Sequence, residues 1–251
     1  MLRSKLPCLT ITNVTVGYGR EPVLQGVSLG IGEGEVLCLV GASGTGKTTL
    51  LHAIGGLVEF SHGAIELDGQ PISGPGPDRA RVFQEDAVFP WFTVADNVRY
   101  SLRIRNAPRE EQRRAVETYL NMVGLAHVAT RYPRELSGGM RKRVDLARVL
   151  AAQPRIILMD EPYASLDAFT KAKLQADFLH LCETAHATSI FVTHDLEEAI
   201  YIGDRVAILS GHPAAIKRII VVPFQHPRSR DIRLHPDFQK LRGELEGELE
   251  V

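Results

Sequence analysis

Hydrophobic and polar positions follow different periods along this 251-residue chain, and each change of period marks an expected element. Residues 10–16 carry β-branched and apolar side chains in near alternation, which predicts a strand, and Gly17-Tyr18-Gly19 predicts a turn after it. Residues 35–40 (EVLCLV) form an apolar run that stops at a glycine-rich loop, as a buried strand does, and residues 48–54 are expected to be helical. Two shorter strands are predicted at 65–67 and 81–83, separated by a Gly- and Pro-rich loop at 71–77.

The middle of the chain has helical periodicity throughout. Thr93 and Asp96 have the spacing of a capping box, and an apolar stripe with helical spacing follows them. Similar stripes predict a second helix that ends at Gly124 and a third that stops before Pro154. Residues 89–153 are therefore expected to form an all-helical block inserted into a chain of alternating strands and helices.

Beyond residue 154 the strand pattern returns. Apolar runs of strand length recur at residues 156–159, 189–192 and 205–209, with helical stretches between them. This alternation predicts a parallel sheet covered on both faces, so the expected fold class is α/β. After Val222 the pattern decays. Only a weak helix is expected at 237–249, where spaced glutamates indicate a solvated face or a frayed end.

Composition narrows the classes of function. The chain has 29 Lys and Arg against 30 Asp and Glu, and a net charge near −1 argues against a protein whose main ligand is a nucleic-acid backbone. No apolar run approaches the roughly 18 residues of a membrane span, and residues 1–19 lack a signal-peptide core. The three cysteines form no C-x-x-C pair, which favours apolar fillers in a reducing cytosol over metal or redox chemistry. We expect a soluble cytosolic chain.

Residues 41–48 (GASGTGKT) fit the pattern G-x-x-x-x-G-K-[ST], between a predicted buried strand and a predicted helix. Glycines let such a loop fold tightly, with its backbone N–H groups pointing at phosphate oxygens. Lys47 would bring a positive charge to the β- and γ-phosphates, and the Thr48 hydroxyl is suited to ligate Mg²⁺. A glycine-rich turn with an incidental lysine is the weaker alternative. The motif predicts a nucleotide site made by Gly41, Ala42, Ser43, Gly44, Thr45, Gly46, Lys47, Thr48 and Thr49.

Two carboxylates and a histidine follow predicted strands of the same sheet. Asp160 ends one strand, where its carboxylate is suited to hold Mg²⁺ directly or through water. Glu161 is expected to point elsewhere, because side chains alternate along a strand, and to take a proton from attacking water. His194 follows another strand at the same sheet edge and is expected to contact the γ-phosphate. Just after it, Asp195 and Glu198 are suited to cap the next helix. A structural role at a strand end is the alternative for both Glu161 and His194.

Residues 136–140 (LSGGM) offer a second place where bare backbone N–H groups could grip phosphate at the start of a helix. Only one hydrophobic segment that ends in acidic residues follows, at residues 156–161. The chain thus has two segments suited to bind phosphate, the two phosphate grips, but one segment suited to bind a metal. A single bound nucleotide does not explain this combination. The mismatch indicates a protein that works in pairs.

With these motifs in this order, the chain resembles the ATP-binding subunits of ABC transporters over nearly its whole length. The resemblance implies a P-loop NTPase fold with a RecA-like parallel core, an N-terminal antiparallel β subdomain and an inserted helical subdomain. It also implies ATP and Mg²⁺ as ligands, with the metal near Thr48, Gln84 and Asp160. Residues 136–140 match the signature loop, in which Ser137, Gly138 and Gly139 press on the γ-phosphate of the nucleotide held by the opposite subunit.

Three further assignments rest on the resemblance alone. Gln84 matches a glutamine that senses Mg²⁺ and the attacking water, and it joins Glu161 and His194 in the expected catalytic set. Asp167, within Ser165-Leu166-Asp167, matches a loop that lines the dimer interface. Tyr18 matches an aromatic residue that stacks on adenine, and a tyrosine merely exposed in a turn remains the alternative.

The resemblance also gives domain bounds. An ABC ATPase domain is expected at 1–222, with its core at 1–88 and 154–222 and the helical subdomain at 89–153. A short extension of unassigned role would occupy 223–251. Met140 stands where many members carry Gln, and Lys142 and Asp145 are less usual. We expect surface variation at Lys142 and Asp145, with Asp145 pairing with Arg141 or Arg148.

One branch of the family, the importers of nitrate, sulfonate, taurine and bicarbonate, is resembled by residues 137–144, 160–167, 227–231 and 237–238. The expected partners are a second ATP-binding subunit, integral membrane permease subunits and, indirectly, a solute-binding protein, with no nucleic acid. This places the protein at the cytoplasmic face of the membrane. The solute and the direction of transport follow from no residue of the chain itself.

Alternatives remain at two levels. The aromatic cluster at residues 89–92 is expected to form part of a groove for a short helix of the membrane subunit, with packing between lobes as the alternative. For the whole protein, a soluble ABC ATPase of translation or DNA repair is disfavoured by the single cassette and the lack of a long heptad run. A monomeric P-loop kinase leaves the second phosphate grip unexplained.

Overall fold

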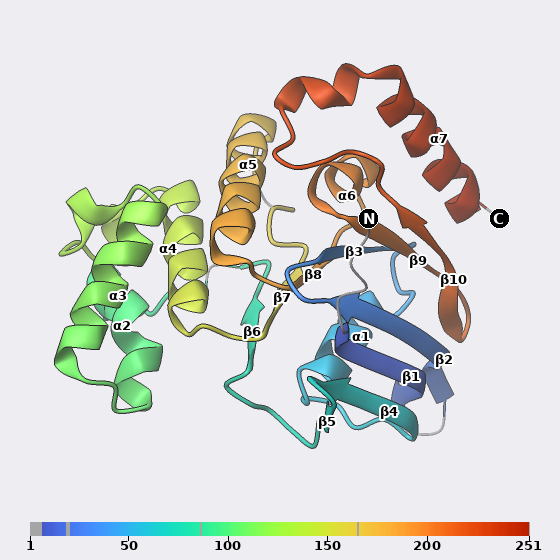
Figure 1. Ribbon diagram of the computed structural model, residues 1–251, viewed down its shortest axis with the longest axis horizontal. Coiled ribbons are helices and arrows are strands. Elements are labelled where there is room, and N and C mark those ends of the chain that lie inside the picture. Colours follow the sequence, from blue (N-terminus) through green and yellow to red (C-terminus); the bar gives the residue numbers. More distant parts are fainter. Residues whose placement is uncertain (1–6, 19–20, 86, 165, 251) are drawn as a thin grey trace.

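The computed structural model describes residues 7–18, 21–85, 87–164 and 166–250. Figure 1 shows a twisted sheet with its helices, a block of helices to the left of the view, and a last helix that runs over the top of the sheet. Gly19 and Ser165, which belong to segments singled out above, lie outside the described residues.

Within the described ranges, ten strands form one mixed sheet in the order β5-β4-β1-β2-β10-β9-β3-β8-β7-β6. Strands β9, β3, β8, β7 and β6 are parallel neighbours, which confirms the predicted parallel α/β sheet for this half. Strands β5, β4, β1 and β2 pair antiparallel, and β10 joins this part to β9. The bounds are β1 (Pro7–Tyr18), β2 (Glu21–Gly32), β3 (Val36–Val40), β4 (His62–Leu67), β5 (Gln70–Pro71), β6 (Arg79–Val82), β7 (Ile156–Asp160), β8 (Ser189–Val192), β9 (Arg205–Gly211) and β10 (Ala214–Val221).

Two long strands, β2 and β10, were not predicted. The turn predicted at Gly17-Tyr18-Gly19 is wrong for Gly17 and Tyr18, and Gly19 lies outside the described residues. Gly17 and Tyr18 continue β1 and pair with Pro22 and Glu21. A Cβ on Gly17 would lie 2.3 Å from the Glu21 carbonyl oxygen, so the glycine marks a close approach of two strands rather than the end of one. The short strand β5 likewise takes up the first residue of the predicted loop at 71–77.

Strand β3 shows why the sheet is covered on both faces. All five of its residues are buried, and they alternate between two hydrophobic clusters. Cys38 faces the cluster shared with the helices α5 and α6, and Leu39 faces the cluster shared with α1 and the antiparallel strands. The helices are α1 (Lys47–Ile54), α2 (Val94–Ile104), α3 (Arg109–Met122), α4 (Gly138–Ala151), α5 (Ala168–Ala185), α6 (Leu196–Ile202) and α7 (Pro236–Glu250), with the short 3₁₀ turns η1 (Ala126–Val128), η2 (Pro133–Glu135) and η3 (Arg230–Leu234).

The three predicted helices of the middle segment are confirmed as α2, α3 and α4, which stand apart from the sheet in Figure 1. Helix α2 begins after Thr93, whose hydroxyl accepts a hydrogen bond from the Asp96 backbone N–H at 3.1 Å. The side chain of Asn97 is fully buried and bonds to the backbone of Phe89, Phe92 and Thr93. These bonds fix the aromatic segment against the start of α2.

The C-terminal segment is anchored to the sheet domain by a buried arginine. Arg228 donates to the carbonyl oxygens of Ile200, Tyr201 and Gly203 at 2.8–3.0 Å, which satisfies the end of α6. Burial lowers the pKa of its guanidinium. Of the two alternatives for the glutamates of α7, the structure supports the solvated face: Glu244 and Glu246 are exposed, while Phe238, Leu241 and Leu245 are buried on the other side. Glu244 and Glu248 pair with Arg218.

Candidate functional site

The loop at residues 41–46 connects the end of β3 to the start of α1, as the sequence predicts. Gly44 and Gly46 have φ angles of 81° and 87°, which favour glycine. A Cβ on Gly41 would lie 2.5 Å from the Leu209 carbonyl oxygen. Gly46 precedes α1 without a side-chain cap, so the first backbone N–H groups of α1 are left for an anion.

Lys47 is the most constrained charge of this loop. Its side-chain ammonium donates to the carbonyl oxygens of Gly41 and Ala42, at 2.8 Å each, and the residue is 7% exposed. Burial lowers the pKa of Lys47, and the negative charges of Glu161 and Asp160 oppose that shift. An ammonium has three donors, so these two bonds leave one for a phosphate oxygen.

Asp160 is held by two side chains from two other elements. The Thr48 hydroxyl on α1 donates to Oδ1 at 3.1 Å, and the Arg81 guanidinium on β6 donates to Oδ2 at 2.6 Å. The contact with Thr48 joins two of the three residues predicted to surround a metal. Arg81 was missed as part of the site, and strand register could have found it. It lies opposite Leu158, two residues before Asp160 and therefore on the same face.

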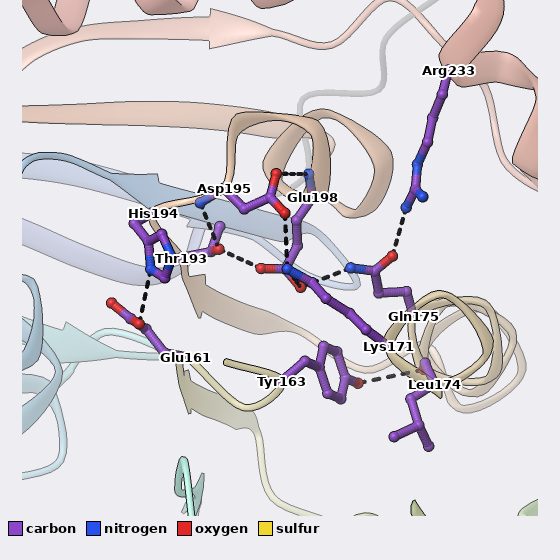
Figure 2. A network of polar contacts seen from close by, with 10 residues as sticks. All are labelled: Glu161, Tyr163, Lys171, Leu174, Gln175, Thr193, His194, Asp195, Glu198 and Arg233. Atoms are coloured by element: carbon purple, nitrogen blue, oxygen red, sulfur yellow. Dashed lines mark hydrogen bonds and ion pairs between the residues drawn. The ribbon is translucent and has the colours of Figure 1, made fainter. Parts of the chain in front are cut away.

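Glu161 takes a different partner from Asp160, as strand alternation predicts. Its backbone has a φ of 44°, which ends the strand, and its Oε2 lies 3.0 Å from Nδ1 of His194 (Figure 2). The His194 side chain is 66% exposed and that of Glu161 is 29% exposed. The structure thus brings together a carboxylate and an imidazole at the edge where β7 and β8 end.

A buried polar network fixes the segment that carries His194 (Figure 2). Thr193 donates to the Glu198 carboxylate, which also accepts from the Gln175 amide at 2.8 Å. Lys171 donates to Asp195 at 2.8 Å. Burial alone would lower the pKa of Lys171, but the hydrogen bond to Asp195 and the charge of Glu198 raise it overall. The predicted capping of α6 by Asp195 is confirmed by its bond to the Glu198 backbone N–H at 3.1 Å.

The network continues beyond the core. Arg233, which lies in η3, donates to the Gln175 side-chain oxygen at 2.6 Å and lies over the Tyr201 ring. Figure 2 shows it reaching Gln175 from the side opposite His194. The C-terminal extension, to which the sequence assigns no role, therefore contacts the elements that support the His194 segment.

The segment at residues 136–140 is more open than the loop at 41–46. Ser137 is exposed and caps α4 by accepting from the Met140 backbone N–H at 3.4 Å, while Gly138 and Gly139 form the first turn. Within the described part of the chain, no hydrogen bond or ion pair joins Ser137, Gly138 or Gly139 to residues 41–48. The two predicted phosphate grips are separate within one copy.

Lys142 and Asp145 are not surface residues, so the expectation of surface variation is wrong. Lys142 is 4% exposed and its ammonium donates to the carbonyl oxygens of Phe83 and Gln84, the latter at 3.1 Å. Asp145 is fully buried and pairs with Arg148 at 2.6 Å, one of its two expected partners. Lys142 therefore ties α4 to the backbone of Gln84, while the Gln84 residue itself is exposed after β6.

Two other predicted site residues lie in different surroundings. Asp167 caps α5 by accepting from the backbone N–H groups of Phe169 and Thr170 at 3.1 and 3.0 Å. These bonds, with that to Thr170 first, lower the pKa of Asp167. Tyr18 is 58% exposed at the end of β1. Exposure is compatible with both its expected role and the alternative.

Comparison with known proteins identifies the family. A family model described as "ABC transporter" matches residues 24–164, which is more than half of the chain. The chain belongs to the ABC transporter family. The matched part includes the loop at 41–48, residues 136–140 and the pair Asp160 and Glu161.

Several curated ABC proteins align along most of the chain. A bicarbonate transport ATP-binding protein of Synechococcus elongatus is 43% identical over 226 residues, which are 88% of this chain and 34% of that protein. The chain thus spans about a third of the length of this relative. A nitrate import ATP-binding protein of the same organism is 39% identical over 90% of this chain and 84% of its own length. An ATP-binding protein of Brucella abortus is 39% identical over 95% and 92%.

Two solved ABC structures share the fold. The CbiO1 protein of Clostridium perfringens, part of a transporter complex, superposes with a TM-score of 0.81 at 24% identity and covers 96% of this chain and 99% of its own. A dimeric ATP-binding cassette in a post-hydrolysis state, bound to ADP and phosphate, has a TM-score of 0.71 at 31% identity and covers 86% and 100%. The predicted P-loop NTPase fold of an ABC ATPase is confirmed.

The aromatic segment of this ABC chain lies at its surface. Trp91 is 67% exposed, whereas Phe89 is partly buried and packs against Tyr100 with ring centroids 4.6 Å apart. The cluster is therefore divided between packing and exposure.

The helices in the part of the chain that the structure describes include none with the length and apolar character of a membrane span.

Proposed function

We propose that this chain is the ATP-hydrolysing subunit of a transporter that imports a small anion across the cytoplasmic membrane. One observation carries the ATPase part. Thr48, Asp160, Glu161 and His194 meet at the ends of β7, β8 and the start of α1, beside an uncapped glycine loop. The names of the bicarbonate and nitrate relatives support import of an anion.

The oxygen atoms at this edge fit Mg²⁺. The Thr48 hydroxyl and the Asp160 carboxylate lie 3.1 Å apart and both are hard oxygen donors, which Mg²⁺ prefers. Among the described residues, no group of three or more His, Cys, Asp or Glu side chains could hold a metal alone. Such a site suits a cation that is shared with phosphates and water, with Gln84 as a further ligand. When bound, Mg²⁺ supplies positive charge that stabilises the phosphates during hydrolysis.

The remaining roles belong to side chains of this chain. Glu161 accepts the proton of the attacking water, because its carboxylate is separate from Asp160 and 29% exposed. His194, 3.0 Å from Glu161, orients that carboxylate and contacts the γ-phosphate. Lys47 and the backbone N–H groups of the loop bind the phosphates, and Tyr18 stacks on the adenine.

The second phosphate grip completes the site of another copy. Ser137, Gly138 and Gly139 present an exposed helix start that has no acidic residue in its first turn. Two copies in head-to-tail contact would each place this helix start on the γ-phosphate of the other, and Asp167 would line the interface. Binding of ATP then favours the closed pair, and hydrolysis reopens it.

Trp91 is the side chain proposed to meet the membrane permease. It is 67% exposed on a segment that Asn97 holds rigidly, which suits a preformed docking surface. We expect Trp91→Ala to abolish copurification with the permease while the ATPase activity of the isolated chain is unchanged. Leu234→Ala, which removes an 81% exposed side chain on η3, is the matched control. Retained binding by Trp91→Ala would place the docking surface elsewhere.

The transport assignment is tested in cells. Uptake of labelled nitrate, bicarbonate, taurine and an alkyl sulfonate is measured with the wild-type chain and with Lys47→Ala. Loss of uptake of one anion supports the proposal and names the solute. Unchanged uptake of all four, with no permease copurifying, would favour a soluble ABC ATPase instead.

A further inference from the structure

Arg81 is the nearest cation to the carboxylate proposed to hold Mg²⁺. Its guanidinium bonds to Oδ2 of Asp160 at 2.6 Å, and both side chains are 14% exposed. The other oxygen of Asp160 accepts from Thr48 at 3.1 Å. Both carboxylate oxygens are therefore engaged, one by a metal-ligand candidate and the other by a fixed positive charge.

The surroundings of Arg81 keep this charge in place. Its guanidinium lies over the Phe83 ring, 4.7 Å from the ring centroid. Asp160 is its carboxylate partner, and no second acidic side chain pairs with Arg81 among the described residues. The positive charge also reaches α1, where burial and then Arg81 lower the pKa of His52. A short ion pair with little solvent is screened weakly, so the charge acts on anything else that Asp160 binds.

We propose that Arg81 competes with the divalent cation for Asp160 and so sets how strongly ATP binding depends on Mg²⁺. The proposal rests on the proposed ATPase function. The guanidinium of Arg81 and Mg²⁺ are both positively charged and would both bind the carboxylate of Asp160. Each therefore weakens the binding of the other to that carboxylate. Arg81 thus narrows the difference in affinity between ATP with and without the metal.

A purely structural role for Arg81 predicts something else. If the pair only joined β6 to β7, its loss would lower stability and weaken ATP binding equally with and without Mg²⁺. The two interpretations differ in one ratio, the dissociation constant of ATP in EDTA divided by that in saturating Mg²⁺. Competition by Arg81 keeps this ratio small in the wild-type chain.

The test uses calorimetric titration of ATP into the full chain carrying Glu161→Gln, which prevents hydrolysis during the measurement. Arg81→Met removes the charge and keeps the length of the side chain, and Arg81→Lys keeps the charge. We expect the ratio to rise about tenfold in Arg81→Met, the scale of one charged hydrogen bond, and to stay near the wild-type value in Arg81→Lys. Arg81→Gln replaces Arg81→Met if thermal unfolding shows that the Met variant is not folded.

Arg205→Met is the matched control. It removes a similar partly buried ion pair, with Glu35 at 2.9 Å, on β9. The ratio should not change in this variant. An unchanged or smaller ratio in Arg81→Met, or an equal rise in Arg81→Lys, overturns competition by charge. Failure of the proposed function looks different, because the parent Glu161→Gln chain would then bind ATP under neither condition.

Discussion

The two regions proposed to grip phosphate differ in how many contacts the chain itself provides. At the loop of residues 41–46 and the end of β7, Lys47, Thr48 and Asp160 all bond to partners within the same copy. At the start of α4, Ser137 is exposed and makes one capping bond. The first region is internally assembled, and the second presents its donors outward.

This difference has a physical reason. Partly buried charged side chains and the backbone polar groups of glycine turns need hydrogen-bond partners within the chain. Without such partners they destabilise the folded state. A helix start at the surface can leave its N–H groups to water until an anion arrives. The contrast fits the proposed site divided between two copies, while Lys142 joins α4 to the backbone at Gln84 within one copy.

The largest expected effect lies in the assembled region. Glu161→Gln should lower the hydrolysis rate about 100- to 10,000-fold, because it removes a general base while keeping its shape. The partner of His194 is kept as a neutral amide, so ATP binding should persist and ATP-bound pairs should accumulate. Steady-state phosphate release and size-exclusion chromatography with ATP measure the two outcomes. A strictly monomeric variant at saturating ATP would contradict the paired arrangement.

The next prediction tests the outward-facing region. A Cβ at Gly138 would have the end of the Arg141 side chain, 3.7 Å away, as its one close neighbour, so the fold should tolerate Gly138→Asp. The new carboxylate should repel the phosphate. Lys47→Ala disables the other region. Each variant alone should have little activity, on the order of a hundredth of wild type. A mixture should regain activity, because a mixed pair contains one site with an intact Lys47 from one copy and an intact Gly138 from the other.

The control for this mixture is a chain carrying both substitutions, mixed with the Lys47→Ala chain. Every pair in that mixture lacks an intact site, so phosphate release should stay at the background level. Recovery only in the first mixture assigns the two grips to different copies. Equal activity in both mixtures would mean that one copy supplies its whole site.

The same contrast explains what the sequence predicted well. The loop at 41–48 and the split between Asp160 and Glu161 depend on local spacing and on alternation along one strand, which a sequence displays directly. The capping roles of Thr93 and Asp195 are local in the same sense. Their contacts lie within five residues, so no tertiary arrangement is needed to foresee them.

The features that were missed depend on contacts between distant segments. Arg81 joins the site through the register of β6 on β7, and Lys142 is buried because α4 packs against the end of β6. Glycines interrupt the apolar pattern of β2, where Gly26 has a φ of 67° and the pairing with β1 is irregular. The burial of a side chain and the irregularity of a strand both depend on which distant segments pack against them. The local sequence pattern does not show which segments these are.

The smallest predicted effect concerns the support of the His194 segment. Burial would raise the pKa of Asp195, but its bonds to Lys171 and to backbone N–H groups lower it overall. A lowered pKa in the folded state means stability that is present above the unfolded pKa and lost as pH falls through the folded one. Asp195→Asn keeps the cap of α6 and loses this charge. Because the Asp195 side chain is 37% exposed, we expect a loss of less than about 1 kcal/mol at pH 7.

Urea unfolding of the wild-type chain and Asp195→Asn between pH 7 and about pH 2.5 measures the difference. The gap in unfolding free energy should persist down to about pH 4 and shrink below it, because the pKa of Asp195 in the folded chain lies below its ordinary value of 3.8 and only protonation there removes the same charge from the wild-type chain. Lys171→Met should show the same pH dependence, because it deletes the other member of the pair. A gap that is constant with pH would mean that Asp195 acts only as a cap. The segment carrying His194 would then be held by its other hydrogen bonds, including the one that Thr193 donates to Glu198, rather than by the ion pair of Lys171 and Asp195.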